Sequence, residues 1–212
     1  MNIHLFAHSS LWIINVVYFI AIWFQIYCNY KRQSVKGLSD LMLFGYLAAY
    51  VAQTFFIFTT DFPISAQFMV PLSMWAVVMM VVQRFMYSFG KGYIQTFVGS
   101  YMVFLTIVVC CVPLAYHYPD QVNYYSGWAA TFLWALFPIP QMIKMYQTKS
   151  TEGFSFSFVL IMTLGGVFEF ISSIILRLPL PMMITIVRSF LCNLIFCIQF
   201  YLYNKPQKKY KA

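Results

Sequence analysis

The sequence predicts an all-α membrane protein with seven transmembrane helices, arranged as two parallel three-helix repeats joined by a linker helix. Three observations support this fold class: the composition, a series of apolar stretches of membrane-spanning length, and a match of the chain with itself at a fixed offset. Of the 212 residues, 62% are hydrophobic and only 8% are charged, whereas average soluble domains carry about 25% charged residues. This composition excludes a water-soluble globule.

Seven apolar stretches have roughly the length of ~20 residues that crosses the hydrocarbon core of a bilayer. Glycine, proline or polar residues separate each stretch from the next. In chain order the stretches cover residues 10–28, 38–59, 64–86, 93–116, 124–146, 155–176 and 181–203. Each stretch is expected to form one transmembrane helix.

The formal charge of +8 follows the membrane topology and does not indicate a nucleic-acid partner. Lysines and arginines gather after the first, third, fifth and seventh stretches, whereas Arg177 alone lies at the opposite ends. By the positive-inside rule, the N-terminus is expected outside and the basic tail at residues 204–212 in the cytosol. A bacterial cytoplasmic membrane and a lysosome-like organelle both remain open as locations.

An internal repeat appears when the chain is shifted by 116 residues, which aligns its first part with its last part without a gap. The matched residues include types that are not trivial in a membrane protein, such as Trp12/Trp128, Gln25/Gln141, Gly37/Gly153, Pro63/Pro179 and Ser73/Ser189. The offset defines two three-helix repeats at residues 10–87 and 126–203, with the helix at 93–116 unmatched between them.

The unmatched helix has a topological role. A three-helix unit that begins outside ends inside, so one extra crossing must return the chain before a second unit can insert in the same orientation. The repeats are therefore parallel, and such proteins commonly bind a solute between their units near the bilayer midplane. Movement of one bundle against the other then exposes the solute to alternate sides.

The loop of the second repeat carries a recognisable motif. Pro140 and Gln141 are followed by KSTEGFS at residues 149–155, then by Val159-Leu160 and by a glycine pair at residues 165–166. This pattern resembles the PQ-loop family, and in particular its cystinosin branch. The first loop keeps Gln25 and KRQSVKGLS but has Phe24 where the family has its motif proline.

The resemblance implies a seven-helix transporter of small organic solutes in which Gln25, Pro140 and Gln141 belong to hinges. Proline removes a backbone donor and clashes with the preceding turn, so Pro140 is expected to kink the fifth helix near its cytosolic end. Gln141 is a candidate to hydrogen-bond the freed backbone groups. The alternative interpretation is a static kink without a gating role.

Two ionisable residues fall within the predicted spans, where charge is costly and often functional. Glu169 and Arg188 stand on the two helices that meet at the turn near Arg177, so they are expected to pair. One interpretation is that the two charges only neutralise each other. The other is that Glu169 couples transport to protons, with Arg188 and the loss of solvation controlling its protonation.

Gln53, Asn193 and Trp75 are candidates for contacting a solute. Gln53 is the repeat equivalent of Glu169, so the two are expected to flank one cavity. Asn193 lies near the middle of the last helix, where relatives place an acidic residue or a substrate-binding asparagine, although an interhelical hydrogen bond is an equally ordinary role. Trp75 and Trp134 offer rings on which a sugar or an amino acid could stack.

Two departures from the cystinosin pattern weaken an assignment to cystine. Met162 stands where the resemblance calls for an acidic residue, and Phe158 stands where it calls for an asparagine. Proton coupling would then depend on Glu169 or on another group that takes the place of this acidic residue.

The sequence favours a secondary transporter or facilitator of a small polar solute, with amino acids ahead of sugars and proton symport as an option. A sugar facilitator of the same fold and a membrane receptor of the KDEL-receptor type are the alternatives. No nucleophile, base and orienting group are clustered in the sequence, and no metal-ligand pattern occurs, so no enzymatic activity, metal or cofactor is expected. The oligomeric state is left open.

Overall fold

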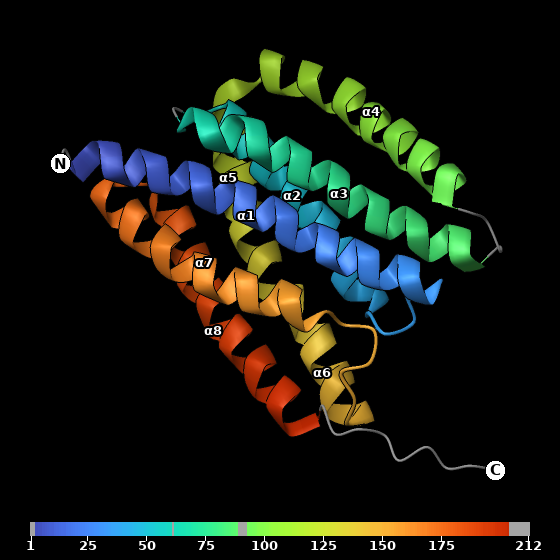
Figure 1. Ribbon diagram of the computed structural model, residues 1–212. Helices are drawn as coiled ribbons and strands as arrows, with labels where there is room; N and C mark the ends of the chain where they lie inside the picture. Colours follow the sequence, from blue (N-terminus) through green and yellow to red (C-terminus); the bar gives the residue numbers. More distant parts are fainter. Residues whose placement is uncertain (1–2, 61, 89–92, 204–212) are drawn as a thin grey trace, which may run out of the picture.

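Figure 1 shows the computed structural model, which describes residues 3–60, 62–88 and 93–203. All regular secondary structure within these residues is helical. The eight helices are α1 (Ile3–Arg32), α2 (Asp40–Phe58), α3 (Ile64–Ser88), α4 (Tyr93–His117), α5 (Pro119–Leu136), α6 (Pro138–Thr148), α7 (Phe156–Ile175) and α8 (Leu180–Tyr203). The predicted basic tail at residues 204–212 lies outside the described residues.

Five of these helices are long and apolar enough to cross a membrane, as judged by length and composition: α1, α2, α3, α7 and α8. The remaining helices occupy the predicted stretches 93–116 and 124–146. Helix α4 covers the first of these stretches, and the second is divided between α5 and α6. The chain is therefore a multi-pass helical membrane protein.

The predicted fifth helix is interrupted before Pro140. The Phe137 N–H still donates to the Leu133 carbonyl at 2.9 Å, but Pro138 and Pro140 have no N–H with which to continue the helical hydrogen bonds. The next helix, α6, therefore begins at Pro138. Pro140 falls in its first turn, where proline is tolerated. The kink expected at Pro140 lies earlier than predicted, because two prolines interrupt the helix together.

The helices pack in a pattern that is repeated between the first and last parts of the chain. In the first half, α1 and α2 both pack against α3, and in the second half α5 and α7 both pack against α8. Between the halves, α1 packs against α7 and α2 packs against α5. Helix α4 packs mainly against α3 and runs along the outer edge of the bundle in Figure 1.

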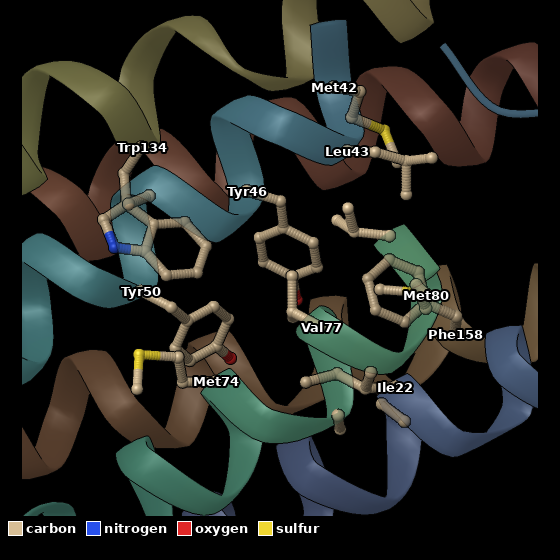
Figure 2. Close-up of a cluster of buried hydrophobic side chains, with 14 of the residues drawn as sticks. Ile22, Met42, Leu43, Tyr46, Tyr50, Met74, Val77, Met80, Trp134 and Phe158 are labelled. Atoms are coloured by element: carbon tan, nitrogen blue, oxygen red, sulfur yellow. The ribbon is translucent and has the colours of Figure 1, made fainter. Parts of the chain in front are cut away.

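The apolar core lies between these two halves. Figure 2 shows Tyr46 of α2 near its centre, together with Ile22 from α1, Val77 from α3, Trp134 from α5 and Phe158 from α7. The Tyr46 ring centroid is 5.5 Å from that of Trp134 and 6.5 Å from that of Phe158, both in edge-to-face arrangements that aromatic pairs favour. Because both halves contribute to one core, side chains from each half can meet at its centre.

Candidate functional site

A small polar cavity lies between the two halves. Its volume is about 60 Å³, enough for a few water molecules and well below the ~300 Å³ of the smaller ligand pockets in proteins. Its polar lining residues come from five helices and include Asn15, Gln53, Ser73, Glu169, Ser189 and Asn193. Polar groups from both halves thus gather at this cavity.

Two hydrogen bonds cross between the halves at this cavity. The Trp134 Nε1–H donates to Gln53 Oε1 at 2.9 Å, and the Tyr18 hydroxyl donates to Glu169 Oε2 at 2.8 Å. Tyr18 and Trp134 are equivalent at the offset of 116 residues, and so are Gln53 and Glu169. The same hydrogen bond is therefore made twice, once from each half to the other, with different side chains.

The cavity lies where the two repeats face each other. Besides the two hydrogen-bonded pairs, the equivalent residues Ser73 and Ser189 both line it. Asn193 breaks this symmetry, because its repeat equivalent is the buried Val77 of the core. The second half consequently supplies both the carboxyl group of Glu169 and the amide of Asn193.

The structure brings together most of the residues predicted to contact a solute. Gln53, Asn193 and Glu169 line the same cavity, and so does Trp134. Trp75 does not line the cavity; its ring packs edge-on against Trp23 of α1 with centroids 6.0 Å apart. Of the two tryptophans considered for stacking, the structure therefore favours Trp134.

The expected ion pair between Glu169 and Arg188 is not formed in this structure. The Glu169 carboxylate faces Tyr18 of α1, and no ion pair joins it to Arg188 among the described residues. Arg188 Cζ lies 5.7 Å from the ring centroid of Trp134 and 6.0 Å from that of Phe137. The two charged side chains face different helices, which is why they do not meet.

The α1–α2 loop (residues 33–39) and the α6–α7 loop (residues 149–155) meet at one end of the bundle, which we call the loop end. Gln25 of α1 reaches the second of these loops. Its Nε2 donates to the Gly153 carbonyl at 2.8 Å, and its Oε1 accepts from the Ser155 N–H at 2.7 Å. The first half is thereby tied to the loop of the second.

Gln141 of α6 makes the equivalent pair of bonds in the opposite direction. Its Oε1 accepts from the Ser39 N–H at 2.7 Å, and its Nε2 donates to the Gly37 carbonyl at 3.2 Å. Gln25 and Gln141 are each only 1% exposed, so a broken bond would leave buried polar groups unpaired. We call these four hydrogen bonds the loop clamp.

The loop clamp is reinforced by a close backbone contact and by an ion pair. Gly37 and Gly153 approach so closely that a Cβ on Gly37 would collide with the backbone of Glu152 and Gly153. Gly153 also has a φ of 86°, which glycine adopts readily and other residues do not. Arg32 Nη2 lies 2.6 Å from Glu152 Oε1 and joins the end of α1 to the α6–α7 loop at the surface.

A further pair of glutamines ties helices within each half. Gln83 Nε2 donates to the Ile26 carbonyl at 3.3 Å, and Gln199 Nε2 donates to the Met142 carbonyl at 2.9 Å. Both glutamines and both acceptors are equivalent at the offset of 116 residues. The repeat thus holds for polar contacts near the loop end as well as for those at the cavity.

Sequence reasoning missed Tyr18 and the partners of the two loop-clamp glutamines. A signal for Tyr18 exists in the sequence, because it is the repeat equivalent of Trp134, one of the tryptophans considered for stacking. Gln141 was expected to bond to backbone freed by Pro140 in its own helix. It bonds instead to the loop of the other half, a contact that depends on how the halves are assembled.

The comparisons with known proteins agree with this repeat. A sequence model of the PQ loop repeat matches the chain twice, at residues 6–66 and 122–182. The second match is displaced from the first by the offset of the internal repeat, and the two matches together cover more than half of the chain. No curated protein matches the chain at a significant level.

Proposed function

The chain belongs to the PQ loop repeat family, and on that basis we propose that it is a secondary transporter or facilitator of a small polar organic solute. The observation that carries this proposal is the polar cavity between two halves that are joined by matched hydrogen bonds. A site shared by two related bundles is the place where alternating access requires the solute to bind. The cavity is assigned to binding and passage, not to catalysis.

The proposed architecture has seven crossings, in which α5 and α6 together form the fifth. Residues 10–87 and 126–203 are the two repeats, and the helix at 93–116 is the linker that restores the orientation of the second. The equivalent packing of the two halves supports this division. The distribution of lysine and arginine supports a cytosolic loop end and an N-terminus on the outer side.

The proposed mechanism alternates between a closed and an open loop end. With the loop clamp formed, the cavity has room only for water, which corresponds to an occluded form closed to the cytosol. A hollow of about 730 Å³ at the opposite end, lined in part by His8, Phe62 and Arg177, suits an outer vestibule. The interruption of helical hydrogen bonding at Pro138 and Pro140 is the place where α6 could tilt relative to α5 and carry Gln141 away from its loop.

The proposed solute is an amino acid, with a sugar as the second choice. The motif at Pro140 and Gln141 resembles the cystinosin branch, which favours amino acids. Met162, at the position where that resemblance calls for an acidic residue, lines the cavity and brings no charge. Glu169 is on the same cavity wall and supplies the carboxyl group that Met162 lacks.

Asn193→Ala tests the binding site. Ligand binding to the folded state raises its stability, by about 2.7 kcal/mol at a hundredfold excess over Kd. We expect purified wild-type protein to be stabilised by one class of amino acids, sugars or short peptides. Asn193→Ala should weaken binding of that ligand about tenfold, because an amide hydrogen-bond partner is lost. Thermal unfolding in detergent measures the shift, and uptake into vesicles shows whether the ligand is transported.

Asn123→Ala is the matched control, because Asn123 donates to the Thr59 carbonyl and the Thr60 hydroxyl, away from the cavity. This variant should lose stability while keeping the ligand-induced shift. Ligand binding that Asn193→Ala leaves unchanged would remove Asn193 from the site. Stabilisation by peptides without any uptake would favour a receptor over a transporter.

Glu169→Gln tests proton coupling. If Glu169 carries the proton, uptake by the wild-type protein should be driven by a pH gradient across the vesicle membrane, and Glu169→Gln should abolish that dependence while still allowing solute exchange down its own gradient. Comparing gradient-driven uptake with counterflow separates the two effects. Uptake by Glu169→Gln that still follows the pH gradient would rule out this role.

A further inference from the structure

Arg188 has an unusual environment for a charged residue inside a membrane protein. Its Nε and Nη2 atoms are buried and have no hydrogen-bond partner in the structure. The Cys192 thiol lies beside the guanidinium, but a thiol is a weak and neutral acceptor. A buried charge without hydrogen-bond partners is costly, and ionisable residues within a membrane often mark a substrate or ion pathway.

The two unpaired nitrogens define the geometry of the missing partner. Nε and Nη2 lie on the same edge of the planar guanidinium, and their N–H groups form a fork that matches the two oxygens of a carboxylate. A carboxylate bound at this edge would receive two parallel charge-assisted hydrogen bonds. A neutral hydroxyl or amide oxygen can accept a hydrogen bond from one of these N–H groups. It lacks the second oxygen and the negative charge with which a carboxylate pairs with both.

Arg188 is not itself a lining residue of the central cavity, but it lies next to residues that are. Its neighbours on α8, Thr185 and Ser189, line that cavity, and the Trp134 ring that lines the cavity also lies beside the guanidinium. The Glu169 carboxylate accepts a hydrogen bond from Tyr18 of α1 and, among the described residues, forms no ion pair with Arg188. Among the described residues, no group therefore hydrogen-bonds to this edge of Arg188.

We propose that the Nε–Nη2 edge of Arg188 binds the carboxylate of the transported solute, so that the solute is an amino acid or another small carboxylic acid. This inference rests on the proposed transport function and makes it more specific. Arg188 holds the carboxylate beside Trp134, while Asn193 and Glu169 on the cavity wall remain for the other polar groups of the solute. For an amino acid, the ammonium group suits the Glu169 side chain.

The test compares each standard amino acid with its own carboxamide, which keeps the size of the molecule and removes the negative charge. Binding to the purified full-length protein is measured by thermal unfolding, and uptake is measured in vesicles. We expect wild-type protein to bind an acid about 10- to 100-fold more tightly than its carboxamide. Arg188→Gln should lose this discrimination, and Arg188→Lys, which keeps the charge without the fork, should lose most of it.

Arg84→Gln is the matched control, because Arg84 pairs with Asp40 at the protein surface and does not line the cavity; it should keep the discrimination. If Arg188→Gln does not fold, Arg188→Lys provides the comparison at unchanged charge. An unchanged preference for acids in both Arg188 variants would overturn the inference and leave the transport function standing. The inference would also be overturned if the wild-type protein took up sugars or carboxamides as fast as it takes up acids. Failure of the wild-type protein to bind or transport any solute would contradict the proposed function itself.

Discussion

Gly37→Ala is expected to force the two loops apart and to open the loop end of the bundle. The added Cβ would collide with the backbone of Glu152 and Gly153, and no side-chain rotation can relieve a clash with backbone. Overpacking of this kind costs about 1–3 kcal/mol, which corresponds to a shift of about tenfold to hundredfold in a conformational equilibrium. The clash exists only while the loop clamp is formed, so the open form gains population.

Gly153→Ala should have the larger effect of the two. Its Cβ would meet Gly37 and the Arg32 side chain, and its φ of 86° adds a backbone strain of about 1 kcal/mol or more for alanine. The population of the open form can be followed through Ser189→Cys in the cavity, by its reaction with a membrane-impermeant thiol reagent and by identification of the labelled peptide by mass spectrometry.

Gly99→Ala in α4 is the control, because its Cβ would meet no backbone and would lie 3.3 Å from side-chain methyl groups of Met86 and Val82. This variant should label like the parent protein. Equal labelling and equal uptake in Gly37→Ala and in the parent would mean that the glycine contact is not part of the gate.

The sequence predicted the broad architecture, because hydrophobic length and a fixed repeat offset are properties of the chain itself. The pairing of Gln53 with Glu169 by that offset correctly anticipated one shared cavity. The break before Pro140 was missed because the prediction considered Pro140 alone, whereas Pro138 and Pro140 interrupt the helix together.

The contacts that were predicted wrongly depend on how each helix is rotated about its own axis. In a helix that is apolar on most faces, the sequence does not show which face points toward the cavity. A change of one residue turns the side-chain direction by about 100° in an α-helix. Trp75 was predicted to contact the solute, yet Trp75 does not line the cavity and Trp134 does. In the same way, Glu169 faces Tyr18 of α1 and not the neighbouring α8.

A covalent link between the two loops is expected to stop transport. Arg32 and Glu152 contact each other across the loop end at 2.6 Å and are partly exposed, so a pair of cysteines at these positions can be joined by a short, cleavable thiol cross-linker. Exposed ion pairs contribute only about 0–1 kcal/mol, and the double variant Arg32→Cys/Glu152→Cys should therefore transport normally before cross-linking. Once linked, the loop clamp cannot open.

This cross-link tests the central claim that the two halves must separate at the loop end for a solute to pass. The experiment measures uptake of the identified solute into vesicles before linking, after linking and after cleavage of the linker, in a background without the five native cysteines. The single variants Arg32→Cys and Glu152→Cys, treated in the same way, control for modification of either residue alone. The account predicts that uptake falls to background in the linked double variant and recovers on cleavage. Undiminished uptake by fully cross-linked protein would contradict it.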